Sequence, residues 1–435
     1  MTHPDSPHVA VIGGGICGLA AAHRLARRGT RVTLLESSDQ LGGLGTFFAH
    51  EDQWVERFYH CIMPSDVSLL ALLGELGLRD AVRWRETTMG MVVDGRHHGF
   101  NSALDLLRFS PLRLHDRVRF GVVSLLLRRL GHGRDLDTLR TEDWLRRLYG
   151  DVVWEQLFAP MFGSKFGPSF GDVPALYLWQ RLGRERNVAT RGYPDGGYKT
   201  IIDALRTSIE RAGGTVRTET PVRRLHSTGG RSVLTLTGGE VLDADHVVST
   251  VPLPLLRRIA DDALATRLPD TDLPYQGVVT GVFFLRQPVT EHYWTPVLHS
   301  GTEFDGVVSM SALAGTTGGR HLVYVMHYTD RDSQLYLDDD AAIAARWSVQ
   351  LRGLYPALGD GDIEEVRVFK APFVEPVYPL GYLAARPPVT VDGTGLLLAT
   401  TAHVYPDVTS WNSSVRLAND VVALLADQPA VTPAR

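Results

Sequence analysis

The sequence predicts an α/β protein with two domains: a parallel-sheet domain assembled from separated segments, and an α+β domain built from the segments between them. The chain has 435 residues, which exceeds the size of one ordinary domain. A strand–turn–helix–strand unit opens the chain, and a helical block and a strand-rich block follow it. No internal repeat or low-complexity linker interrupts these blocks.

The opening unit accounts for the first part of the parallel sheet. Residues 8–12 form an apolar run that is typical of a buried strand. Residues 19–28 are rich in alanine and predict a helix, and Gly29 is the residue type expected just after its end. Residues 31–35 predict a second strand, which Glu36 follows directly. This order is typical of a βαβ unit in a parallel sheet.

Gly13, Gly15 and Gly18 form a G-x-G-x-x-G motif between the first strand and the helix. Gly13 permits the tight turn, Gly15 lets the backbone approach a pyrophosphate, and Gly18 allows close packing of helix and strand. The phosphates then lie at the helix N-terminus, where free N–H groups favour negative charge. Glu36, at the end of the second strand, is placed to bind a ribose diol. The strand, helix and acidic residue together predict a Rossmann-type dinucleotide site.

A second glycine pair, Gly42-Gly43, follows Glu36 closely and resembles a flavoprotein family. That family contains monoamine oxidase, protoporphyrinogen oxidase, carotenoid desaturases and UDP-galactopyranose mutase. The likeness continues, in order, through segments 193–209, 221–225, 243–252, 395–399 and 411–425. The resemblance implies a Rossmann-type FAD-binding domain and a separate substrate domain.

The resemblance implies FAD as the cofactor. It places the final helix with its N-terminus toward the pyrimidine edge of the flavin, where negative charge accumulates on reduction. The predicted cofactor-binding residues are Gly13, Gly15, Ile16, Cys17, Gly18, Glu36, Ser37, Gly42, Gly43, Leu44, Val222, Thr250, Asn412 and Ser413.

The two domains are predicted to alternate along the chain. The FAD-binding domain takes residues 1–90, 191–265 and 391–435. The helical part of the substrate domain takes residues 91–190, and its sheet part takes residues 266–390.

Within the substrate domain, residues 91–100 predict a hairpin that turns at Asp94-Gly95. Helices are predicted within 104–130, 142–158 and 175–182, and strands over 278–285, 293–299, 307–311, 322–328 and 363–373. The arginine-rich segment 112–130 is amphipathic. A helix with one solvated face is favoured there over a helix that lies on a membrane surface, because no aromatic or lipid anchor accompanies it.

Catalytic candidates are few, because the flavin itself accepts the hydride in such enzymes. His60 and Cys61 lie in a stretch that resembles the one where a histidine contacts the flavin in the mutases. Proton relay suits His60, while Cys61 could relay a proton, tether the flavin or simply fill space. Lys165, one of three lysines, is expected in a glycine-flanked loop between helices. Glu375 and Tyr378 are expected to line the pocket, with ordinary packing in a turn as the alternative.

Composition excludes several other classes of protein. The 44 basic and 49 acidic residues give a charge of −5, which offers no electrostatic basis for binding nucleic acid. Two cysteines cannot form a disulfide framework, and no apolar run is long enough to insert stably into a membrane. A cytoplasmic protein with a small-molecule substrate is expected. No metal-binding motif occurs.

The predicted function is an FAD-dependent oxidoreductase, either oxidase or dehydrogenase, that removes a hydride from a small-molecule metabolite onto flavin N5. Specialised biosynthesis is a suitable context. The alternative is a redox-neutral, flavin-dependent sugar isomerase of the UDP-galactopyranose mutase kind, and a third option is a non-catalytic protein that FAD stabilises. Amine oxidation is disfavoured, because Leu44 replaces the arginine of the amine oxidases and Thr400-Thr401 replaces a common Gly-Asp pair.

Overall fold

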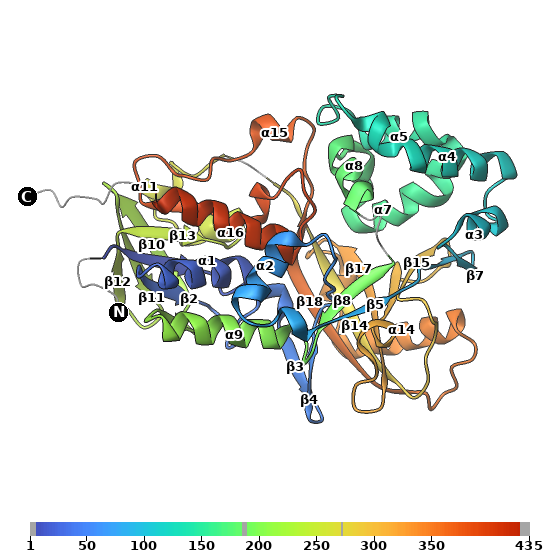
Figure 1. Ribbon diagram of the computed structural model, residues 1–435, viewed down its shortest axis with the longest axis horizontal. Coiled ribbons are helices and arrows are strands. Elements are labelled where there is room, and N and C mark those ends of the chain that lie inside the picture. Colours follow the sequence, from blue (N-terminus) through green and yellow to red (C-terminus); the bar gives the residue numbers. More distant parts are fainter. Residues whose placement is uncertain (1–5, 185–188, 271–272, 427–435) are drawn as a thin grey trace, which may run out of the picture.

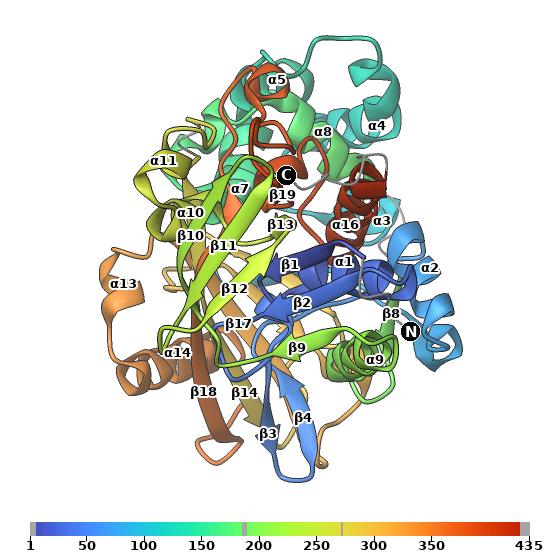
Figure 2. The ribbon, with the colours of Figure 1, turned by 90° about the vertical axis from the view of Figure 1, so that its left-hand side faces the viewer.

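The computed structural model describes residues 6–184, 189–270 and 273–426. Its first sheet has five strands, all parallel, in the order β19-β13-β1-β2-β9 (Figures 1 and 2). These strands are β1 (His8–Ile12), β2 (Arg31–Leu35), β9 (Thr215–Arg217), β13 (His246–Ser249) and β19 (Leu396–Leu398). The sheet takes strands from each of the three segments assigned above to the FAD-binding domain, but the limits of those segments stay a prediction.

Three helices pack together beside this sheet: α1 (Ile16–Arg27), α9 (Tyr198–Arg211) and α16 (Trp411–Ala426). Helix α1 lies between the other two and contacts both (Figure 1). Its alanine-rich buried side lets its neighbours approach closely, and the apolar side chains of all three helices share one core with β1 and β2. A small antiparallel sheet lies beside this layer and is formed by β10 (Val222–Thr228), β11 (Arg231–Leu236) and β12 (Val241–Ala244).

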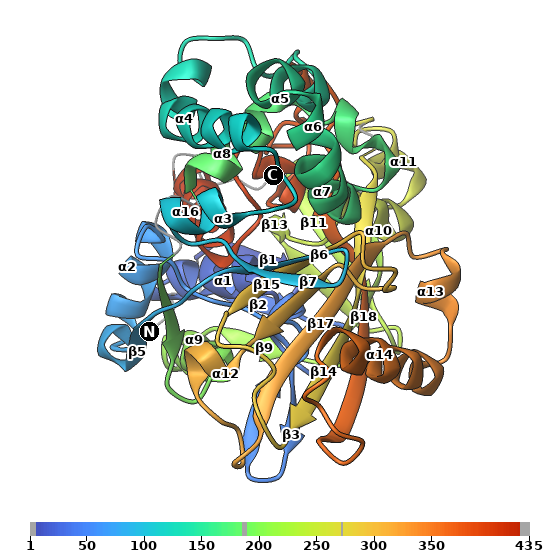
Figure 3. The same ribbon diagram turned by 90° about the vertical axis from the view of Figure 1, so that its right-hand side faces the viewer.

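A second large sheet of seven strands has the order β18-β14-β17-β16-β15-β6-β7 (Figure 3). Side chains of its long strand β14 alternate between two cores. Phe283 packs on the side of Trp347 in helix α14, whereas Val282 and Phe284 pack on the opposite side. A strand that is buried on both faces reads as a continuous apolar run, as β14 does. The strands are β6 (Gly90–Val93), β7 (Arg96–Gly99), β14 (Tyr275–Leu285), β15 (Trp294–Leu298), β16 (Gly306–Ser309), β17 (His321–Thr329) and β18 (Ile363–Pro376).

A helical lobe stands at one end of the seven-stranded sheet (Figures 1 and 3). It contains α3 (Ala103–Arg108), α4 (Leu114–Gly131), α5 (Thr141–Tyr149), α6 (Asp151–Val153), a π-helical turn (Trp154–Phe158), α7 (Ala159–Phe166) and α8 (Ala175–Arg184). Stacked aromatic rings fill its interior: the rings of Trp154 and Phe170 lie 5.3 Å apart, and those of Phe158 and Phe162 lie 6.1 Å apart.

Shorter elements connect these layers. They are α2 (Val67–Glu75), β3 (Phe47–His50), β4 (Gln53–Glu56), β5 (Val82–Glu86), β8 (Thr190–Pro194), α10 (Leu253–Ile259), α11 (Asp262–Ala265), α12 (Ser311–Ala314), α13 (Gln334–Leu337), α14 (Asp340–Leu354) and α15 (Tyr382–Ala385). The predicted α/β class is confirmed. Helix α14 was not predicted, although Asp339 caps it with hydrogen bonds from the Ala341 and Ala342 N–H groups, which is a signal that the sequence carries.

Candidate active site

A cavity of about 840 Å³ extends from the glycine-rich turn after β1 to the helical lobe. This volume is in the range of cofactor and substrate sites. The five-stranded sheet forms one end of the cavity, the seven-stranded sheet forms a side, and the lobe closes the far end. The predicted site residues that line it are Gly13, Gly15, Ile16, Cys17, Glu36, Gly42, Gly43, Leu44, His60, Cys61, Lys165 and Thr250.

The turn around Gly13–Gly15 and the glycine pair Gly42-Gly43 lie side by side at the sheet end of the cavity, and we call them together the cradle. Gly42 N–H donates to the Gly14 carbonyl at 2.8 Å, so the segments pair directly. Gly13 has a φ of +105°, and a Cβ on Gly18 would lie 2.0 Å from the Gly13 carbonyl oxygen. By contrast, a Cβ on Gly15 would meet nothing closer than the Gly43 Cα at 3.9 Å. Gly15 therefore faces open space, where a side chain would fill part of the cavity.

Helix α1 begins beside this open space without a side-chain cap. Gly15 is its N-cap residue, no side chain accepts a hydrogen bond from its first N–H groups, and no acidic residue lies in its first turn. Uncapped N–H groups and the helix dipole attract an anion. The bare cradle and the uncapped helix end therefore fit the pyrophosphate of a dinucleotide such as FAD.

Glu36 lies at the outer end of the cradle. Its carboxylate accepts hydrogen bonds from Gly14 N–H at 2.7 Å and from Ser38 N–H at 2.8 Å. The hydroxyls of Ser37 and Ser38 also donate to it, at 3.1 Å and 3.0 Å. These contacts fix the carboxylate at the cavity edge, and one of its oxygens bonds the cradle itself. Ser37 acts through Glu36 and does not line the cavity.

The start of α16 borders the cavity, but the predicted residues Asn412 and Ser413 do not line it. Asn412 accepts hydrogen bonds from Ser68 and Leu69 N–H at 2.9 Å and 3.1 Å, and it thereby caps α2. The Ser413 hydroxyl bonds back to the Val408 carbonyl at 2.9 Å. Neither side chain lines the cavity; Ser410, Trp411 and Ser414 do. Val222 and Gly18 also lie outside the cavity wall.

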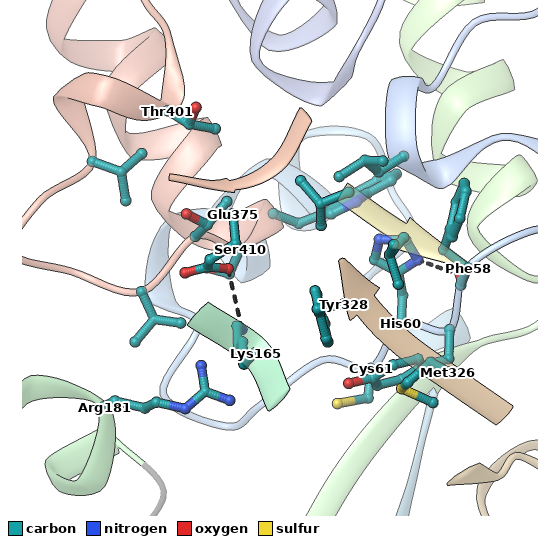
Figure 4. Close-up of a pocket in the computed structure, with 18 of the residues that line it drawn as sticks. Phe58, His60, Cys61, Lys165, Arg181, Met326, Tyr328, Glu375, Thr401 and Ser410 are labelled. Atoms are coloured by element: carbon teal, nitrogen blue, oxygen red, sulfur yellow. Dashed lines mark hydrogen bonds and ion pairs between the residues drawn. The ribbon is translucent and has the colours of Figure 1, made fainter. Parts of the chain in front are cut away.

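His60 lies on the cavity wall beside the start of α16, where its ring centre is 5.8 Å from that of Trp411, and its protonation state follows from its contacts. Its Nδ1 lies 2.8 Å from the Phe58 carbonyl oxygen (Figure 4). A carbonyl only accepts, so Nδ1 carries the proton and Nε2 keeps its lone pair. Burial lowers the pKa of His60 to about 4. At neutral pH His60 is therefore an uncharged hydrogen-bond acceptor and only a weak base.

The two cysteines lie at different depths. Cys17, in α1, contacts the Ala399 carbonyl at 3.5 Å, and burial raises its pKa to about 12, so its thiol stays protonated. Cys61 lies beside Met326 of β17, in the part of the cavity between the seven-stranded sheet and the lobe, which we call the chamber (Figure 4). Burial and the nearby Cys61 raise the pKa of Tyr293 well above its ordinary value. The phenol therefore stays protonated next to the thiol.

A buried ionic cluster joins the lobe to the seven-stranded sheet. Lys165 Nζ lies 3.1 Å from a Glu375 carboxylate oxygen (Figure 4). The Tyr177 hydroxyl donates to the other oxygen. Glu375 is 3% exposed. Lys165 lies in the last turn of α7, so the prediction that it lies in a loop was wrong. Its flanking glycine, Gly163, continues the helix, and only Gly167 leaves it, with a φ of +75°.

The prediction that Tyr378 lines the pocket was wrong. Tyr378 is 1% exposed, and its hydroxyl donates to the Thr401 carbonyl at 3.0 Å. It packs against the rings of Tyr177, Tyr382 and Tyr405 in the core behind the cavity wall. Phe373, Val374 and Glu375, just before it in the chain, line the cavity, whereas β18 ends at Pro376 and the chain turns before Tyr378.

Several cavity residues had no signal in the sequence that singled them out. Tyr328 of β17 lies between Lys165 and His60 in the close-up, and Lys165 Nζ is 5.2 Å from its ring centre. Burial, Tyr59 and Glu375 raise the pKa of Tyr328 well above its ordinary value, which keeps the phenol neutral. Arg181 of α8 borders the same chamber (Figure 4). Because side chains alternate along a strand, the sequence predicts that Met326 and Tyr328 lie on the same face of β17. It does not predict whether that face lies toward the cavity or away from it.

The described part of the chain contains neither a cluster of metal ligands nor a membrane-spanning helix. Within it, no group of three His, Cys, Asp or Glu residues could hold a metal ion. None of the described helices combines the length and apolar character required to cross a bilayer.

Comparisons with known proteins agree with this geometry. The family model described as flavin containing amine oxidoreductase matches residues 16–408. A 15-cis-phytoene desaturase of Capsicum annuum is 23% identical over 279 residues, which cover 58% of this chain and 48% of that protein. The chain thus spans about half the length of the curated relatives it matches first.

Solved structures share the fold over nearly the whole chain. A protoporphyrinogen oxidase-like protein from Exiguobacterium sp. 255-15 has a TM-score of 0.78 at 19% identity, covering 97% of this chain and 99% of its own. Reduced UDP-galactopyranose mutase has a TM-score of 0.75 at 16% identity, covering 97% and 94%. The predicted resemblance is confirmed: the chain belongs to the flavin containing amine oxidoreductase family.

Proposed function

We propose that this protein is an FAD-dependent oxidoreductase that takes a hydride from a largely apolar small-molecule metabolite onto flavin N5. One observation carries the proposal: a single cavity joins the bare glycine cradle at α1 to a chamber lined mainly by aromatic and aliphatic side chains. FAD, when bound, supplies the hydride acceptor. Gly15, the N-terminus of α1 and Glu36 would hold its pyrophosphate and ribose.

The residues of the chamber position a substrate and exclude water. Phe58, Tyr59, Phe162 and Tyr328 offer apolar surface for substrate carbon. His60 presents a neutral Nε2, which can accept one hydrogen bond from a substrate or cofactor N–H or O–H. Its pKa of about 4 makes it unsuited to storing a proton at neutral pH. The Lys165–Glu375 pair places a fixed dipole in the cavity wall and can orient a polar end of the substrate.

The test is an absorbance spectrum of the purified protein before and after acid precipitation, then after anaerobic dithionite and after air. Flavin bands that leave with the supernatant and return quickly in air support a non-covalent oxidase. Reduced flavin that resists oxygen supports a dehydrogenase. Flavin that stays in the pellet assigns its attachment to Cys61 or His60. No flavin, even after incubation with FAD, would overturn the proposal.

The alternative is a redox-neutral sugar isomerase, which the place of His60 and Cys61 on the cavity wall favours. An isomerase would turn over only after the flavin is reduced and would consume no electron acceptor. An oxidoreductase would bleach its flavin band stoichiometrically with substrate under anaerobic conditions. A protein that does neither, with every donor tried, would be a non-catalytic FAD-binding protein.

A further inference from the structure

Exposed apolar side chains cluster on two neighbouring helices of the lobe. Of the 17 large apolar side chains that are exposed in the described part of the chain, 7 lie on α3 and α4. We call these seven the α3–α4 face; they are Leu104, Leu107, Leu114, Val118, Val122, Leu125 and Leu126. The two helices pack against each other, with Leu106 of α3 next to Gly121 of α4. The face therefore lies on two adjoining helices of the lobe, whose ribbons Figure 3 shows.

Helix α4 is apolar on two opposite sides. On its inner side, Phe120 and Leu127 line the cavity. On its outer side, exposed residues recur every three or four positions from Leu114, which is 62% exposed, to Leu125, which is 79% exposed. A large exposed apolar surface marks a binding site. The outer face is exposed, as the expectation of a solvated face has it, but its apolar residues make a binding role worth testing.

Positive charge borders this surface. Arg113, Arg119, Arg128 and Arg129 of this segment are all exposed. The only acidic residue within α4, Asp116, is 5% exposed and lies on the inner side. The whole chain has a charge of −5, so this basic surface differs in sign from the rest of the molecule. A second copy would bring like charges together, which disfavours self-association through this face.

We propose that the α3–α4 face binds the surface of an anionic lipid bilayer. The leucine and valine side chains enter the boundary between headgroups and acyl chains, and the arginines contact lipid phosphates. The cavity wall formed by Phe120 and Leu127 would then lie one helix thickness from the apolar phase. Vesicle binding requires no turnover, so this proposal and the proposed function can fail separately.

The test is flotation of the full-length holoprotein with vesicles of phosphatidylcholine alone or mixed with phosphatidylglycerol. We expect binding to the mixed vesicles to exceed binding to phosphatidylcholine at least about tenfold, and to weaken at high salt. The double variant Val118→Glu/Val122→Glu should lower binding to the mixed vesicles at least about tenfold, because carboxylates oppose both insertion and the negative surface.

The matched control is Val241→Glu/Val349→Glu, which changes two comparably exposed valines outside the lobe, on β12 and α14. It should bind as the wild type does. Flavin content and the thermal midpoint establish that both variants fold. Three results would overturn the proposal: no binding of the wild type to anionic vesicles at low salt, equal loss in the control, or a concentration-dependent dimer that the face variant alone abolishes.

Discussion

Replacing Gly15 by alanine should separate cofactor binding from folding. In the protein itself the added methyl group has room, because its nearest neighbour would be the Gly43 Cα at 3.9 Å. Gly15 also has an ordinary backbone conformation, with φ −70° and ψ 174°, which alanine adopts without strain. Alanine is a poorer N-cap residue than glycine, which destabilises the folded protein, but it restricts the unfolded chain, which stabilises it. The two effects nearly cancel, so the stability of the apo-protein should change by less than about 1 kcal/mol.

The same methyl group occupies the space through which a pyrophosphate must reach the backbone. Loss of one hydrogen bond to a charged group costs about 1.5–3 kcal/mol. FAD affinity should therefore fall about 10- to 150-fold. The comparison variant is Gly18→Ala, whose Cβ would lie 2.0 Å from the Gly13 carbonyl oxygen. That variant should instead destabilise the apo-protein by about 1–3 kcal/mol, because the backbone must shift.

The assay titrates FAD into apo-protein by flavin fluorescence and measures unfolding of the apo-protein by denaturant. FAD affinity of Gly15→Ala within about twofold of the wild type would refute the assignment of the cradle, since a factor of two is only about 0.4 kcal/mol. A loss of apo-protein stability equal to that of Gly18→Ala would refute the claim that Gly15 faces open space.

Three further changes test other parts of the molecule: two residues of the cavity wall, and the buried His403 just outside it. Glu36→Ala should weaken FAD binding about tenfold, whereas Ser37→Ala, which keeps the Glu36 carboxylate, should weaken it less. FAD titration measures both affinities, and equal affinities of the two variants would show that the ribose is bound elsewhere. Lys165→Met removes the lysine that pairs with the buried Glu375 carboxylate and leaves it only the hydrogen bond from Tyr177, which should cost about 3–5 kcal/mol of unfolding free energy. The double variant Lys165→Met/Glu375→Gln should restore most of that loss, and a double variant as unstable as the single one would contradict this. Burial lowers the pKa of His403 to about 4, so the unfolded chain binds its proton more tightly and stability should fall as pH drops from about 6.5 to about 4. His403→Gln should flatten that fall by up to about 3 kcal/mol in denaturant titrations at several pH values, and an unchanged slope would assign it to other groups.

The local sequence pattern was sufficient to predict those helices, strands and turns that a few neighbouring residues determine. The turn at Gly13, the start of α1 and the hairpin at Asp94-Gly95 all follow from backbone preferences of short segments. The strands β14 to β18 follow from apolar runs between turn residues. Family resemblance added the parallel sheet, which takes its strands from three separate segments.

The sequence alone determined the fold class, the family and the cradle; only the tertiary structure decided which side chains meet in the chamber. Lys165 and Glu375 are 210 positions apart and pair because α7 packs against the strands of the second sheet. Tyr378 and Asn412 turn away from the cavity because nearby backbone groups accept or donate their hydrogen bonds. The outer face of α4 has an apolar pattern that is identical to a buried one, and only the exposed fractions of its side chains in the folded chain show it to be exposed. Burial and pairing between distant segments depend on packing, which a local pattern does not encode.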